Sequence, residues 1–145
     1  MTIRQKQTFL RDMCYVLRQA AAFRDYGRSG VEDSLIGHPF EPTLHNALLE
    51  SSLAFLRKAN EFFGMKSKAS IRVFFPDQPL EWLWANEDRE LLNERVMHLS
   101  LSEALEGKYD WEDFLNTHLS EAERRFSAFL VRVKSEQPEL FGPRQ

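Results

Sequence analysis

Glycine and proline are confined to a few short breaks in this sequence, and the stretches between the breaks are long enough for helices. The breaks fall at residues 27–42, 64–79 and 107, and a last break near the C-terminus contains Pro138 and Pro143. Because glycine and proline disfavour helix interiors, their positions mark where helices begin and end. The sequence is therefore constrained to a small number of long helices with short or capped connections.

Apolar residues between the breaks recur every three or four positions, which is the period of an amphipathic helix. Asn86 and Asp110 are suitable N-cap residues for the last two of these segments. Gly64 is expected to end the second segment in a left-handed conformation. The predicted helices span residues 3–23, 42–63, 86–98 and 110–134.

Four such helices predict an all-α, up-and-down bundle of four to five helices. We expect one domain over residues 1–145, with a flexible tail over 136–145. Residues 65–83 lack a clear period and have no partner strand, so they are expected to form a loop tucked over the core. Trp82 and Trp84 are the side chains expected to hold this loop in place.

Composition and charge exclude several classes of protein. The chain has 145 residues, of which 43% are hydrophobic and 28% are charged, as in an ordinary globular domain with a sizeable core.

No apolar run is long enough to cross a membrane and no signal peptide is recognisable, so we expect a cytoplasmic protein without a membrane partner. The single cysteine, Cys14, cannot form a disulfide within the chain and is expected to be a buried filler. A net charge of −3 argues against a strongly basic nucleic-acid binder, but it does not exclude a local basic site.

The motifs that mark metal sites and common enzyme classes are missing from the sequence. None of the 4 histidines follows a glutamate by three residues, as the di-metal sites of helical bundles require. No glycine-rich phosphate loop, nucleophile elbow or HExxH motif is present. Glu41 with His45, and Glu94 with His98, are four residues apart, but such pairs are common on helices. We therefore expect no metal and no cofactor, and His118 on the apolar side of the last helix is expected to be a satisfied core histidine.

The end of the third predicted helix carries the candidate catalytic residues. His98 closes this helix, where the negative end of the helix dipole favours an imidazolium, and Arg95 lies one turn earlier. A histidine that moves a proton beside a fixed cation suits phosphodiester chemistry. In the structural alternative, His98 caps the helix end and Arg95 pairs with Glu94 or Asp88. Spacing alone favours this structural alternative.

Several short motifs resemble the HEPN-like superfamily, in particular its abortive-infection and toxin-type members. Residues 46–64 of the second predicted segment, with their Leu-Glu-Ser run and Phe-Phe pair, are similar to the stretch that opens many of these proteins. The segment from Asn93 to Ser100 is similar to the Asn-x-x-x-x-His-Leu-Thr/Ser segment that follows it in them. Trp111 and the Phe-Leu ending of the last predicted helix also stand where these proteins tend to carry a Trp and a Phe-Leu ending. The resemblance covers about residues 46–133 and rests on the order and spacing of the motifs.

The resemblance implies a helical bundle that is often a homodimer and whose active members are metal-independent endoribonucleases of toxin–antitoxin or phage-defence systems. It assigns proton transfer to His98 and a helper or substrate-contact role to Asn93. The arginine of the family signature should stand at position 91, 92 or 93, where this chain has Leu91, Leu92 and Asn93. Either Arg95 substitutes for it, or an arginine from another helix does, or the protein is not a nuclease.

Two functions from different classes stay open at this point. The first is a domain that acts on or binds RNA, with a weakened active site made of His98, Arg95 and Asn93. The second is a non-catalytic homodimer that serves as a protein-interaction or scaffold domain. Binding of a small ligand or nucleotide within the bundle is a third option, which rests only on the breadth of the family. A cluster of Arg57, Arg95 and Arg124 around His98 would favour the enzyme.

Overall fold

The computed structural model describes residues 1–35, 37–39, 41–84, 86–92 and 110–142. In these residues the chain is largely helical and forms no β-strand, which confirms the all-α prediction. No helix in the described ranges is both long enough and apolar enough to cross a membrane. The body of the molecule is made of three long helices: α1 (Ile3–Ala20), α4 (Glu41–Gly64) and α7 (Trp111–Glu136).

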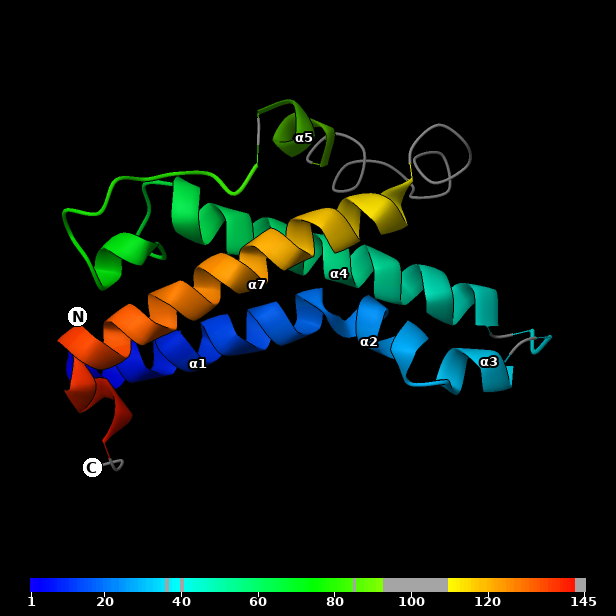
Figure 1. The fold of residues 1–145 in the computed structure, drawn as a ribbon, viewed down its shortest axis with the longest axis horizontal. Helices are drawn as coiled ribbons and strands as arrows, with labels where there is room; N and C mark the ends of the chain where they lie inside the picture. Colours follow the sequence, from blue (N-terminus) through cyan, green and yellow to red (C-terminus); the bar gives the residue numbers. More distant parts are fainter. Residues whose placement is uncertain (36, 40, 85, 93–109, 143–145) are drawn as a thin grey trace.

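The three long helices pack against one another, with α1 running in the opposite direction to α4 and α7 (Figure 1). The chain after α4 runs back along the bundle as far as α5 (Asn86–Leu91) (Figure 1). Both termini lie at one end of the molecule, and α2 and α3 lie at the other (Figure 1). The shorter elements are α2 (Ala22–Arg28), α3 (Val31–Leu35), η1 (Ile71–Val73), α5 (Asn86–Leu91) and η3 (Pro138–Phe141).

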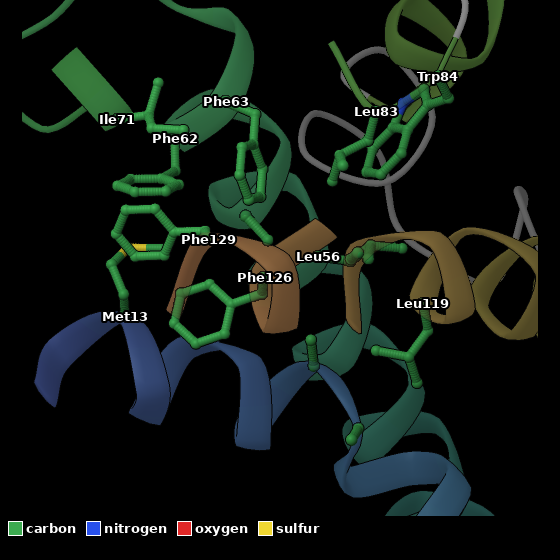
Figure 2. Packing of buried hydrophobic residues seen from close by; sticks show 14 of the residues in the cluster. Met13, Leu56, Phe62, Phe63, Ile71, Leu83, Trp84, Leu119, Phe126 and Phe129 are labelled. Atoms are coloured by element: carbon green, nitrogen blue, oxygen red, sulfur yellow. The ribbon is translucent and has the colours of Figure 1, made fainter. Parts of the chain in front are cut away.

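Phenylalanine rings dominate the core between the long helices (Figure 2). The ring of Phe129 in α7 lies 5.2 Å from those of Phe62 and Phe74 and 5.5 Å from that of Phe126. Phe9 of α1 stacks on Phe74 at 5.7 Å. These contacts join α1, α4, α7 and the loop after α4 into one cluster, with α4 in a central position. That position accounts for the many buried apolar residues of α4, which contacts more than one neighbour.

The segment between α4 and α5 forms a loop over the core, as predicted, with a single 3-10 turn at Ile71–Val73. The loop is held by hydrogen bonds to the last two turns of α4. The Glu81 N–H donates to the Phe63 carbonyl at 3.0 Å, and the Leu83 N–H donates to Asn60 Oδ1 at 2.7 Å. Asn60 is only 1% exposed, so this bond satisfies a polar side chain that would otherwise be buried without a partner.

Gly64 is the last residue of α4, and its close contact with Trp82 explains why the residue is glycine. The described glycines with a positive φ are Gly30 and Gly37, so the prediction of a left-handed Gly64 was wrong. The indole of Trp82 instead packs directly on Gly64. A Cβ at this position would come within 2.7 Å of Trp82 Cγ and closer still to other ring atoms. Glycine is required here because Trp82 fills the space that a side chain would need.

The helix predicted over 3–23 is broken at Ala21 into α1 and α2. Ser52 of α4 is fully buried, and its hydroxyl donates to the Gln19 carbonyl at 3.2 Å and accepts from the Phe23 N–H at 3.0 Å. These two backbone groups would bond to each other in an uninterrupted α-helix. A side chain inserted into this ladder is a recognised cause of helix kinks. The buried hydroxyl of Ser52 therefore accounts for the break.

The C-terminal residues fold back on the bundle. The sequence predicts a flexible tail over 136–145, but Pro138–Phe141 forms η3, which packs against α1 and α7. Gln7 Nε2 donates to the Leu140 carbonyl at 3.3 Å, and Leu140 is buried. Lys6 Nζ donates to Gln137 Oε1 at the same distance. The local sequence signal of a proline-containing tail does not reveal these contacts, because their partners are more than a hundred residues away.

Candidate functional site

The residues that the sequence assigns to catalysis, Asn93, Arg95 and His98, lie outside the described residues, together with the whole segment 93–109. The structure shows where this segment is attached. It leaves α5 just after Leu92, which is buried, and it returns at the N-cap residue of α7. Its two attachment points therefore lie at the end of α5 and at the start of α7.

His118 holds α5 against the N-terminal half of α7. Its Nε2 lies 3.3 Å from Asp88 Oδ2, and its ring packs on Phe114 at 4.4 Å and on Trp84 at 4.8 Å. Burial lowers the pKa of His118, and the neighbouring Asp88 carboxylate opposes that lowering. His118 is thus a core histidine with a satisfied ring nitrogen, as expected, and its partner comes from the helix that leads into the 93–109 segment.

A polar cavity of about 440 Å³ opens between α2, α4 and the first turns of α7. It brings together two guanidinium groups, an imidazole, a carboxylate, an amide and a hydroxyl, with a single aromatic ring. Sites with several convergent polar groups in a concave surface are typical binding sites. The lining residues are Phe23, Arg24, Gly27 and Arg28 of α2, His45 of α4, and Glu112, Asn116 and Ser120 of α7.

His45 is fixed at the wall of this polar cavity by carboxylates on two helices. Its Nε2 lies 3.1 Å from Glu112 Oε1, and its Nδ1 lies 3.8 Å from Glu41 Oε1. The ring also meets the ring of Phe23 edge-on at 4.9 Å. The spacing of Glu41 and His45 was visible in the sequence, whereas the contact with Glu112 joins residues that are far apart in the chain.

The two arginines of the polar cavity differ in their partners. Arg24 forms ion pairs with Glu123 of α7 and with the adjacent Asp25, and the hydrogen bond with Glu123 is the main cause of its raised pKa. Arg28 lies in the last turn of α2 and pairs with no carboxylate of the described residues. Arg24 therefore anchors α2 to α7, and Arg28 is the cation that is left to bind an anion.

Of the three arginines whose clustering around His98 would favour the enzyme, two pair with carboxylates. Arg57 lies 3.1 Å from Glu61, and Arg124 lies 2.6 Å from Glu121, each within its own helix. The third member, Arg95, is outside the described residues. The polar cavity draws its cations from α2 instead, a helix that the sequence analysis did not connect with function.

A periodic signal for the polar cavity is present in the sequence. Its polar residues on α7 recur every four positions, and so do its two arginines on α2, so each set lies on one helix face. What the sequence does not show is that the two faces meet. Their meeting requires the kink at Ala21, which depends on Ser52 of α4, a residue far along the chain.

In the part of the chain that the structure describes, no group of three or more His, Cys, Asp or Glu side chains is arranged to hold a metal ion. Comparisons with protein-family models, with curated proteins and with solved structures give no match to this chain. The function is therefore inferred from the site itself and from the sequence motifs.

Proposed function

We propose that this protein is an RNA-binding domain with an HEPN-like, up-and-down bundle, in which the polar cavity contacts the RNA backbone. The observation that carries the proposal is that Arg28, Arg24 and His45 lie around one concave site beside the start of α7. The segment with the HEPN-like residues Asn93 and His98 is attached at the same helix start.

The side chains of the polar cavity suit a phosphodiester. Arginine presents a planar set of donors that matches the oxygens of a phosphate, and most contacts of proteins with nucleic acids go to the backbone. Arg28 offers this planar set of donors, and no carboxylate of the described residues pairs with it. On the opposite wall the amide of Asn116 adds a neutral donor, while the Ser120 hydroxyl donates to the Asn116 carbonyl at 3.1 Å. The carboxylate of Glu112 limits the total positive charge, so we expect modest affinity and a shallow salt dependence.

The proposal includes weak, metal-independent cleavage by the segment after α5. In such a reaction His98 accepts the proton of the ribose 2′-hydroxyl, the hydroxyl oxygen bonds to the adjacent phosphorus, and the bond from phosphorus to the 5′-oxygen breaks. The leaving 5′-oxygen takes up a proton from water. Arg95 stabilises the extra negative charge on the phosphorane and Asn93 contacts the substrate. Because the signature arginine is absent from positions 91–93, we expect slow turnover.

Binding is tested by fluorescence anisotropy with a labelled, mixed-sequence single-stranded RNA in EDTA. Arg28→Gln should weaken binding about tenfold, since it removes a charge-assisted contact, and it should reduce the salt slope by about 1. Lys68→Gln is the matched control, because it removes one positive charge at an exposed loop position outside the polar cavity. Equal effects of the two substitutions would contradict specific binding at the polar cavity.

Cleavage is tested with the same RNA and the His98→Ala variant. Loss of cleavage in the variant, with RNA binding retained, is the expected result. The alternative function, a non-catalytic homodimeric scaffold, is favoured if the folded wild-type protein neither binds nor cleaves RNA and sediments as a dimer.

A further inference from the structure

A second cavity, also about 440 Å³ in volume, lies at the end of the molecule that carries both termini. We call it the terminal groove. Apolar side chains of three elements form its walls, and polar side chains of α1 form its rim. It is lined by Arg4, Gln7, Leu10, Arg11 and Cys14 of α1, Leu130 of α7, and Leu140, Phe141 and Gly142 in and after η3.

The rim of the terminal groove is cationic, and the described residues that line it include no carboxylate. Arg4 and Arg11 are seven residues apart, so they lie on the same face of α1. Both are exposed, and neither forms an ion pair with a described residue. Arg11 Nη2 donates to the neutral Thr8 hydroxyl at 3.3 Å. In a chain of net charge −3, a rim with two arginines that pair with no described carboxylate is suited to an anionic group.

The walls of the terminal groove are formed in advance of any ligand. Leu10 and Leu140 are buried core residues, whereas the ring of Phe141 is 42% exposed at the edge. Gln7 ties η3 to α1 through the Leu140 carbonyl. Gln137 ties the start of η3 to the loop over the core, because its Nε2 donates to the Phe74 carbonyl at 2.7 Å. A fixed apolar wall lowers the entropic cost of binding.

We propose that the terminal groove binds a free amphipathic anion, with its hydrocarbon part against Leu10, Leu130 and Leu140 and its carboxylate on Arg4 and Arg11. The volume of the groove falls within the roughly 300–1,000 Å³ that small-molecule sites occupy. Charge complementarity at the rim and apolar surface in the walls identify this ligand chemistry. The proposal is independent of RNA binding, because the groove and the polar cavity share no residue.

The first test is titration calorimetry of the whole protein with decanoate and with decanol, each below its aggregation concentration. Decanoate should bind, and decanol should bind about tenfold more weakly because it lacks the charge. The double variant Arg4→Gln/Arg11→Gln should weaken decanoate binding by a similar factor, while Lys68→Gln should leave it within about twofold. The proposal is overturned if decanol binds as tightly as decanoate and the double variant binds both unchanged.

The second test uses Cys14, which is the only cysteine of the chain and lines the terminal groove. Decanoate should slow the reaction of its thiol with the uncharged reagent N-ethylmaleimide in the wild type, and it should do so much less in the double variant. Circular dichroism confirms that the double variant is folded.

A binding experiment with vesicles of phosphatidylglycerol distinguishes binding of a membrane surface from binding of a free ligand. Binding to these vesicles without protection of Cys14 by decanoate would contradict the proposal.

Discussion

The Phe23 N–H donates to the hydroxyl of Ser52 instead of to the Gln19 carbonyl, which would accept this hydrogen bond in an unbroken helix. The distance from the Phe23 nitrogen to Ser52 Oγ is 3.0 Å, and the serine side chain is completely buried. Two residues of one turn are thus bonded through a side chain from another helix. The kink that results turns α2 so that Arg24 reaches Glu123 and Phe23 meets His45.

Ser52→Ala should destabilise the protein by about 1–3 kcal/mol, because the Phe23 N–H would lose its acceptor in a buried place. Urea unfolding followed by circular dichroism measures the change. The neighbouring Ser51→Ala, at a half-buried position, serves as the control and should change the free energy of unfolding by much less. A stability loss of the same size in both variants would contradict the role given to Ser52.

Gly64→Ala should destabilise the fold by about 1–3 kcal/mol through overpacking against Trp82, although alanine favours helices. The cost should disappear in a Trp82→Leu background, because the smaller side chain leaves room for a methyl group. Thermal unfolding of the four proteins of this double-mutant cycle measures the coupling. Additive effects of the two substitutions would show that the indole does not require glycine at this position.

Acid should weaken the fold partly through His118. Burial holds its pKa below the ordinary value of 6.5, so the unfolded chain binds a proton more readily than the native protein as the pH falls through that value. The stability that neutral His118 contributes is therefore present above about pH 6.5 and is lost below it. His118→Gln cannot be protonated. Between about pH 7.5 and about pH 5.5 the variant should lose less unfolding free energy than the wild type, and an equal loss would contradict this assignment.

The local parts of the fold follow from the sequence. Asp110 is the N-cap of α7, and its side chain accepts from the Asp113 N–H at 3.0 Å. Pro42 lies in the first turn of α4, as its missing N–H favours. Signals of this kind involve residues a few positions apart, so they can be recognised from the chain alone.

The features that the sequence does not reveal depend on partners far along the chain. The break at Ala21 requires Ser52, and the glycine at position 64 requires Trp82. The same limit applies to the candidate site. The spacing of Glu41 and His45 is local and was noticed, whereas Glu112 reaches His45 across 67 positions. The polar cavity exists only because α2, α4 and α7 meet.

The most direct test of RNA binding at the polar cavity compares two histidines of the same protein by NMR. His45 lines the cavity, whereas His118 is packed against Trp84 and paired with Asp88. The imidazole signals are assigned with His45→Gln and His118→Gln and then followed during titration with single-stranded RNA in EDTA. Our account predicts that the His45 signals shift to saturation while those of His118 stay in place. Saturable RNA binding that leaves the His45 signals unchanged would contradict it.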